Sequence, residues 1–135
     1  MASIARFSLT ALDCPDPRAL AEFYAAITGW AIDNSEEEED WVQLRSTEGA
    51  TLAFQRVDNY RAPTWPEGDR PQQLHCDFDV ADLDAAEAEI VAIGARRQII
   101  SREPHSGYFS TPPAIPSAWC WRHNGLFTMQ GVGGA

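Results

Sequence analysis

The sequence has few basic residues, no long apolar run and few cysteines, and each scarcity excludes a class of protein. Ten Lys and Arg stand against twenty Asp and Glu, which gives a formal net charge of −10. Nucleic acids and anionic membranes require clustered Lys and Arg, so this charge argues against both as main partners. The apolar stretches are too short to span a bilayer, and the start MASIARFSLT lacks the features of a secretory signal. We therefore expect a cytoplasmic protein.

Cysteine and histidine are both scarce. The cysteines are Cys14, Cys76 and Cys120, an odd number at wide spacing without a CxxC motif. This pattern argues against a disulfide framework and is typical of reduced thiols. His105 and His123 stand in aperiodic segments, where we predict exposed positions, and only His75 falls in a segment with strand periodicity.

Acidic residues gather in one run, Glu36–Asp40. Like charges this close together repel each other and favour exposure, so we predict a solvated turn there. A site for a hard cation is the alternative, and no other feature near the run supports it.

Two segments carry helix signals at both ends. Asp16 followed by Pro17 predicts a helix start, apolar residues then recur at three- and four-residue spacing, and Gly29 predicts the helix end. Asp82 predicts the start of a second helix, which Gly94 closes. The predicted strands are Ile4–Leu12, Trp30–Asn34, Trp41–Arg45, Ala50–Val57, Gln72–Val80 and Gln98–Ser101.

The order of elements repeats, because each half has a strand, an Asp cap, a helix, a Gly stop and further strands. Such a repeat predicts a duplicated βαβββ unit. We therefore predict an α+β fold in which two tandem βαβββ modules form a concave mixed sheet with the helices outside. The first module covers about residues 4–58, a connector 59–71, the second module about 72–109, and an atypical tail 110–135.

Three stretches of the sequence carry a family resemblance. The stretches ALDCPDPRALAEFYAAITGW, LAFQRV and PTWPEGDRPQQLHCDFDVADLDAAEAEIVAIGARR together resemble the glyoxalase-like branch of the vicinal oxygen chelate superfamily. This superfamily also includes glyoxalase I, extradiol dioxygenases and bleomycin- or fosfomycin-resistance proteins. The resemblance covers about Ile4–Arg97 and implies the fold predicted above. It does not fix the reaction, because members share architecture and differ in chemistry.

The resemblance also bears on metal binding. In metal-dependent relatives, four ligands line the concave sheet, on the first and last strands of each half. The second-half position falls on His75, whereas the equivalent first-half position falls on Leu9, which is no ligand. The last strand of the first half offers Gln55, whose amide oxygen binds metals weakly. A divalent metal is therefore not favoured as a cofactor, and at most a partial site of His75 and Gln55 is expected.

Strand alternation predicts a mixed aromatic and polar lining for the concave face, suited to a small organic ligand. The predicted ligand-binding residues are Trp41, Gln43, Arg45, Gln55, His75 and Asp77. His75 has three open roles: a polar or acid–base group in the cavity, a metal ligand, or a structural histidine bonded to a neighbour such as Asp77. For Trp41 the alternative is packing against Trp65 of the connector.

The tail stretch STPPAIPSAWCW departs from the family pattern, in which a closing strand such as LDPAGHPFCLVL stands at this place. Its prolines remove the N–H donors of a strand, so we expect an altered closing strand, an exposed sheet edge and a less complete cavity. Read one base out of register, the tail is compatible with LDPAGHPFCLVL, which indicates a single-base shift near His105–Ser106. An AGY codon for Ser110 or Ser117 in the coding DNA would exclude this origin.

Three hypotheses about function follow. The favoured one is a glyoxalase-like protein that binds a small organic molecule without a complete metal site, as resistance proteins do. The second is a metal-dependent lyase or dioxygenase-like enzyme in which His75 is the catalytic candidate. The third is a frame-shifted product with a residual fold and no activity. The resemblance also implies a homodimer.

Overall fold

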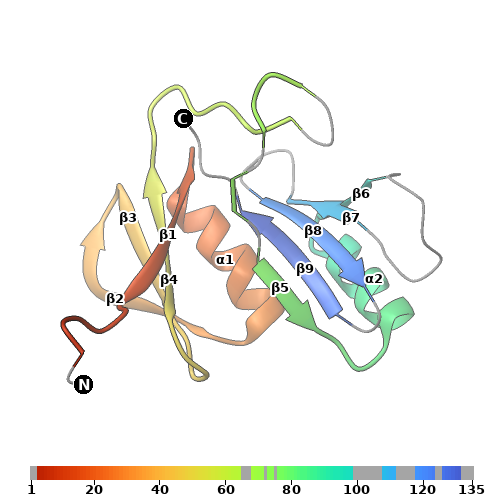
Figure 1. Ribbon diagram of the computed structural model, residues 1–135, viewed down its shortest axis with the longest axis horizontal. Helices are drawn as coiled ribbons and strands as arrows, with labels where there is room; N and C mark the ends of the chain where they lie inside the picture. Colours follow the sequence, from red (N-terminus) through yellow and green to blue (C-terminus); the bar gives the residue numbers. More distant parts are fainter. Residues whose placement is uncertain are drawn as a thin grey trace.

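The computed structural model describes residues 3–64, 68–71, 73–74, 76–98, 108–111, 118–123 and 126–131. Figure 1 shows two sheets in one molecule, with α1 and α2 behind them in this view. The predicted α+β architecture is confirmed. In chain order the elements are β1 (Leu9–Cys14), α1 (Pro17–Thr28), β2 (Ala31–Glu38), β3 (Trp41–Arg45), β4 (Thr51–Arg56), β5 (Cys76–Asp79), α2 (Leu83–Ala92), β6 (Arg96–Gln98), β7 (Tyr108–Ser110), β8 (Ala118–His123) and β9 (Leu126–Gly131).

The first sheet has the strand order β1-β4-β3-β2, with β1 parallel to β4 and the other pairs antiparallel. One face of this sheet packs against α1. The buried side chains between them are Leu12, Cys14, Leu20, Phe23, Tyr24, Leu44, Leu52 and Phe54. Each large apolar side chain buried in this way contributes about 1.5–3 kcal/mol to folding. The core therefore holds α1 firmly on one face, and neither described helix covers the other face of the sheet.

Both predicted helix starts are confirmed. The carboxylate of Asp16 accepts a hydrogen bond from the N–H of Ala19 at 3.0 Å, and that of Asp82 accepts one from Ala85 at 2.8 Å. These bonds satisfy N–H groups that have no partner within the helix. The first helix also ends as predicted, because Gly29 takes the left-handed φ of 72° that favours glycine.

The end of α2 lies slightly before the predicted stop. The helix ends at Ala92, and Ile93 rather than Gly94 is its capping residue. Gly94 follows with a φ of 104° and donates a hydrogen bond to the carbonyl of Val91 at 3.0 Å. The glycine therefore turns the chain after the helix.

Helix α1 joins the two halves through Tyr24, which is fully buried. The centre of its ring lies 5.3 Å from that of Phe54 in β4 and 6.3 Å from that of Phe78 in β5. Aromatic rings at these separations attract each other beyond the burial of their surface. Tyr24 is thus a shared core residue of both modules.

Strand boundaries correct several predictions. Trp41–Arg45 is confirmed to the residue. The first strand is shifted from Ile4–Leu12 to Leu9–Cys14, and the segment that holds Ile4 and Phe7 is exposed and outside any strand. The strand predicted over Gln72–Val80 is shorter, at Cys76–Asp79.

Two further strands also differ. Strand β2 continues well beyond the predicted Trp30–Asn34. The strand predicted at Gln98–Ser101 begins earlier, as Arg96–Gln98, and residues 99–101 lie outside the described part of the chain.

The acidic run is strand for most of its length, so the prediction of a turn over all of Glu36–Asp40 is wrong. Strand β2 reaches Glu38, which lies opposite Trp41, with an irregular register between Asp33 and Glu38. The turn is confined to Glu39 and Asp40, and both are exposed. Antiparallel pairing with Trp41 of β3 holds the backbone of Glu38, whose side chain is exposed.

The second sheet corrects the expectation for the tail. Its strand order is β5-β9-β8-β7-β6, so two strands of the tail, β8 and β9, belong to it. Strand β9 occupies the place beside β5 that we expected to be lost, and it runs antiparallel to β5, whereas β4 runs parallel to β1. The closing strand is thus altered, as predicted, but a paired hairpin takes its place. Neither described helix is long and apolar enough to cross a membrane.

Candidate functional site

The face of the first sheet that is turned away from α1 carries the candidate site. Leu12 and Cys14 in β1 are buried against the helix, so alternation places Ala11 and Asp13 on the opposite face. The register of the four strands then defines two rows that cross this open face. The first row is Asp33, Gln43, Ala53 and Ala11, and the second is Glu38, Trp41, Gln55 and Asp13.

The two rows differ in side-chain size. Ala53, fully buried, and Ala11 lie opposite each other and provide only methyl groups in the middle of the first row. Trp41 and Gln55 lie opposite each other in the second row as an antiparallel pair. Their side chains therefore extend side by side from the open face. A half-buried indole therefore stands beside an exposed amide, next to a floor of small residues.

Arg45 is held by an ion pair at the edge of the open face. Its Nε donates a hydrogen bond to the Oδ2 of Asp33 at 2.8 Å, and its Nη2 lies within ion-pair distance of the same oxygen. The other carboxylate oxygen of Asp33 accepts a hydrogen bond from the backbone N–H of Ser35 at 3.0 Å. Hydrogen bonds from Ser35, followed by that from Arg45, lower the pKa of Asp33 to about 2. The positive charge of Arg45 is therefore already paired with the carboxylate of Asp33.

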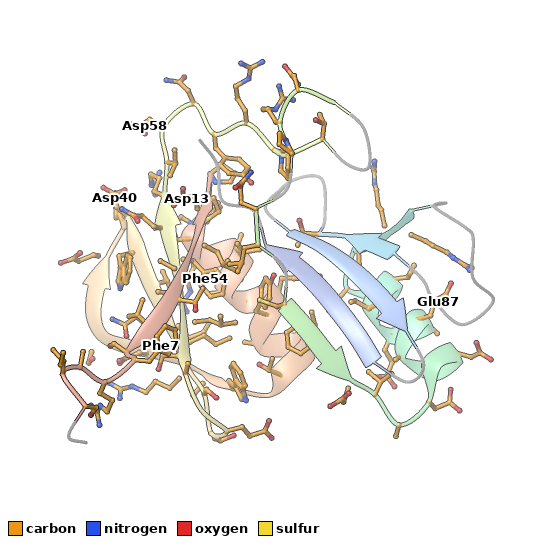
Figure 2. All side chains as sticks on the ribbon, in the orientation of Figure 1. Phe7, Asp13, Asp40, Phe54, Asp58 and Glu87 are labelled. Carbon is orange, nitrogen blue, oxygen red and sulfur yellow. The ribbon has the colours of Figure 1, made fainter. Side chains whose placement is uncertain are left out.

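A second ion pair stands at the upper end of the sheet in Figure 2, near the turn between β2 and β3. Arg56 places its Nε 2.7 Å from the Oδ1 of Asp40 and donates from Nη2 to the carbonyl oxygen of Glu39 at 3.1 Å. Both arginines on these strands therefore carry a carboxylate partner. Asp13 enters none of the ion pairs among the described residues, which gives the open face a net negative character.

Cys14 and Tyr60 lie close to Asp13. Cys14 is fully buried, and its thiol donates a long hydrogen bond of 3.5 Å to the carbonyl oxygen of Gln55. Burial is the main cause that raises the pKa of this thiol to about 12. Burial, followed by the nearby Cys14 and Asp13, also raises the pKa of Tyr60 above its usual range. Within the described part of the chain the Tyr60 hydroxyl is buried without a hydrogen-bond partner. Both groups are protonated at neutral pH.

Trp41 also borders a pocket at the β2–β3 hairpin. This pocket has a volume of about 370 Å³ and is lined by Arg18, Asp33, Asn34, Glu38, Glu39, Trp41 and Val42. Arg18 donates to the side-chain oxygen of Asn34 at 3.1 Å and pairs with Glu22 at the same distance. The indole is thus accessible both from the open face and from the sheet edge.

The predicted ligand-binding residues fall into two groups. The structure brings Trp41, Gln43, Arg45 and Gln55 together on the open face. Asp77 lies in β5 opposite Thr128, and its side chain is outside what the structure describes.

His75 and Trp65 both lie outside the described part of the chain. The cavity, metal-ligand and structural roles predicted for His75 therefore stay predictions, and so does the packing of Trp41 on Trp65. Among the described residues, no three His, Cys, Asp or Glu side chains form a group that could hold a metal ion.

Sequence reasoning missed several residues of this face. Asp13 was missed because the first strand was predicted to end at Leu12, one residue before it. The alternation of Leu12 and Cys14 as apolar residues around Asp13 is the signal that would have extended the strand. Tyr60 lies in an aperiodic connector, and no local pattern predicts its place near Cys14 and Asp13.

Comparisons with known proteins identify the family of the chain. The model of the glyoxalase-like domain family matches residues 10–114 of the chain. The chain therefore belongs to the glyoxalase-like domain family, as the resemblance implied. Among curated proteins there is no significant match. One similar solved structure is an integron cassette protein from the mobile metagenome of V. cholerae, with 11% sequence identity, coverage of 93% of this chain and 91% of that chain, and a TM-score of 0.49.

Proposed function

We propose that this protein binds a small organic molecule on the open face of the first sheet, and that the molecule has an aromatic ring and amide-like polar groups. The observation that carries this proposal is the pairing of Trp41 with Gln55 across β3 and β4, beside the small Ala53. An accessible indole stacks on a planar ring, and an amide side chain both donates and accepts hydrogen bonds.

The charges of the face favour a neutral or cationic molecule. Arg45 and Arg56 are each paired with a carboxylate, so neither offers a free cation to an anionic group. Asp13 lies at the end of the second row, next to Gln55, and would repel an anion or pair with a donor. The proposal therefore excludes a simple carboxylate as the preferred ligand.

The proposed binding needs no metal. The open face offers stacking and hydrogen-bonding groups that hold an organic molecule by themselves. The natural ligand would be recognised by its ring and its polar groups.

Titration of the ¹⁵N-labelled protein with benzamide, followed by NMR, tests this proposal. We expect chemical-shift changes centred on β3 and β4, and about fivefold weaker binding by Trp41→Leu, because an aromatic contact contributes about 1 kcal/mol. Gln55→Ala should weaken binding by about the same factor, since a hydrogen bond contributes about 1 kcal/mol. Shift changes confined to other elements would contradict the proposal.

Matched controls separate the two contacts. Cyclohexanecarboxamide keeps the amide without the flat ring, so we expect it to bind more weakly than benzamide and to be insensitive to Trp41→Leu. Benzoate should bind least, because of Asp13. Gln73, an exposed residue that precedes β5, provides the protein control, and Gln73→Ala should leave the affinity for benzamide unchanged. Equal affinities of all variants for benzamide would contradict the proposed contacts.

We also propose that the protein acts as a homodimer, as the family resemblance implies, and that it acts in the cytoplasm. The position of Ile4 and Phe7 favours a second copy of the chain as the partner. Both are exposed apolar side chains, and they precede the edge strand β1. Light scattering at several concentrations tests the dimer, and a monomer mass at all of them would contradict it.

A further inference from the structure

A separate pocket lies between the two helices, on the side of the molecule away from the open face. Its volume is about 470 Å³, within the range of about 300–1,000 Å³ typical of small-ligand sites. The lining comes from three elements that belong to different modules: α1, the end of β5, and α2. The lining residues are Ala26, Ile27, Phe78, Asp79, Val80, Ala86, Glu89, Ile90, Ala92 and Ile93.

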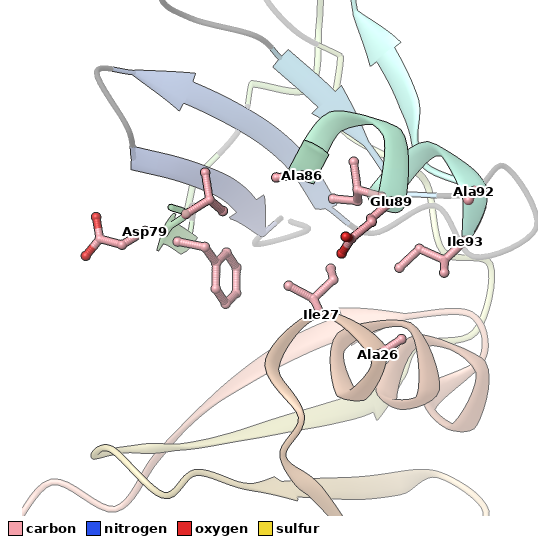
Figure 3. A pocket seen from close by; sticks show the side chains of 10 residues that line it. Ala26, Ile27, Asp79, Ala86, Glu89, Ala92 and Ile93 are labelled. Atoms are coloured by element: carbon pink, nitrogen blue, oxygen red, sulfur yellow. The ribbon is translucent and has the colours of Figure 1, made fainter. Parts of the chain in front are cut away.

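The walls of this inter-helix pocket are largely apolar. In Figure 3, Ile27 of α1 and Ile93 after α2 extend into the space between the helices. Ile93 is 40% exposed although it is a large aliphatic residue. A ligand that covered these side chains would gain the free energy of apolar burial.

One carboxylate faces these walls. Figure 3 shows the side chain of Glu89 pointing from α2 toward Ile27, whereas Asp79 points outward at the rim. Glu87, two residues earlier on the same helix, pairs with Arg97 at 2.9 Å. None of the ion pairs among the described residues includes Glu89. The pocket therefore presents an apolar surface with one negative charge that has no described cationic partner.

We propose that the inter-helix pocket binds a small lipophilic cation, with its ammonium group on Glu89 and its apolar part against Ile27 and Ile93. The volume of the pocket, about 470 Å³, favours a small molecule, because it lies within the range typical of small-ligand sites. The negative charge of Glu89 favours a cation, and the chain's net charge of −10 adds a long-range attraction for cations. Such a ligand would contact both modules at once.

Benzylamine, which carries an ammonium group at neutral pH, is the probe, and benzyl alcohol and phenylacetate are its neutral and anionic counterparts. In NMR titrations we expect benzylamine to shift amides of α1 and α2 and to bind more tightly than both counterparts. Glu89→Gln should weaken benzylamine binding by about fivefold, the upper end for a solvent-accessible ion pair, and added salt should weaken it in the wild type. Glu48→Gln removes the same charge from an exposed loop of the first module and should change nothing.

Two further variants locate the site. Ala26→Phe at an exposed position of α1 should narrow the pocket and weaken benzylamine and benzyl alcohol alike. Trp41→Leu on the open face should leave the benzylamine-induced shift changes of the α1 and α2 amides unchanged. Three results would each overturn the proposal: equal binding of benzylamine and benzyl alcohol, no effect of Glu89→Gln, or loss of the α1 and α2 shift changes in Trp41→Leu. Absence of detectable benzylamine binding at millimolar concentration would overturn it as well.

Discussion

Replacement of Tyr24 by leucine should weaken the connection between the two modules. Leucine keeps an apolar side chain in the core but removes the ring that lies 5.3 Å from Phe54 and 6.3 Å from Phe78. The ring also pairs with that of Phe23 at 5.9 Å. Each aromatic pair contributes about 0.5–1.5 kcal/mol, so loss of the three pairs should lower the free energy of unfolding by about 1.5–4.5 kcal/mol. Urea denaturation followed by circular dichroism measures this change from the shift in midpoint. Because small domains are only about 5–15 kcal/mol stable, the effect is large enough to measure and small enough to leave a folded protein.

Two comparisons show whether the contact between modules is responsible. Tyr24→Phe keeps the ring and should cost less than Tyr24→Leu, and Phe7→Leu, at a position that is 68% exposed, should change the stability by less than about 0.5 kcal/mol. In a double-mutant cycle, Tyr24→Leu and Phe78→Leu should be coupled by at least about 0.5 kcal/mol. Additive effects of these two substitutions would refute the idea that Tyr24 joins the modules.

Three other outcomes follow from the structure. Asp16→Ala and Asp82→Ala should each lower the free energy of unfolding by about 1 kcal/mol, because each removes a helix cap, and urea midpoints that match the wild type would contradict this. The pKa of Cys14 is about 12 in the folded state, above the 9.0 of a free thiol. The stability that the protonated thiol contributes is therefore fully present below pH 9 and is lost as the pH rises from 9 to 12. Cys14→Ala should flatten the fall in the free energy of unfolding between pH 8 and 10. An unchanged slope would show that Cys14 does not cause this fall. In NMR titrations of the Asp33 carboxyl, Ser35→Ala should raise the pKa from about 2 toward 3.8, and an unchanged value would show that the hydroxyl does not bond to Asp33.

Local signals in the sequence predicted the parts of the fold that depend on neighbouring residues. The helix caps at Asp16 and Asp82 depend on contacts three residues away, and both were correct. The alternation in Trp41–Arg45 gave the right strand limits and therefore the right side-chain phase on the open face. This is why Trp41 and Gln43 could be placed on that face from the sequence.

The strands that the sequence did not predict correctly depend on pairing between residues far apart in the chain. The segment around Ile4 and Phe7 has strand composition, but the pairing of β1 with β4 begins only at Leu9, so composition alone set the wrong boundary. In the tail, prolines argued against a strand, yet β8 begins at Ala118, after the last of them. The alternation of Trp119 and Trp121 was a strand signal that the neighbouring prolines obscured.

Binding of benzamide to metal-stripped protein shows directly whether the open face binds a ligand without a complete metal site. The protein is treated with EDTA, checked by elemental analysis, and titrated calorimetrically with benzamide, alongside Trp41→Leu. We predict the same affinity before and after EDTA, unchanged by added Mn²⁺, Ni²⁺ or Zn²⁺, and about fivefold weaker binding by Trp41→Leu. Loss of binding on EDTA treatment, restored by one of these metals and abolished by His75→Ala, would contradict the account and identify a metal-dependent site instead.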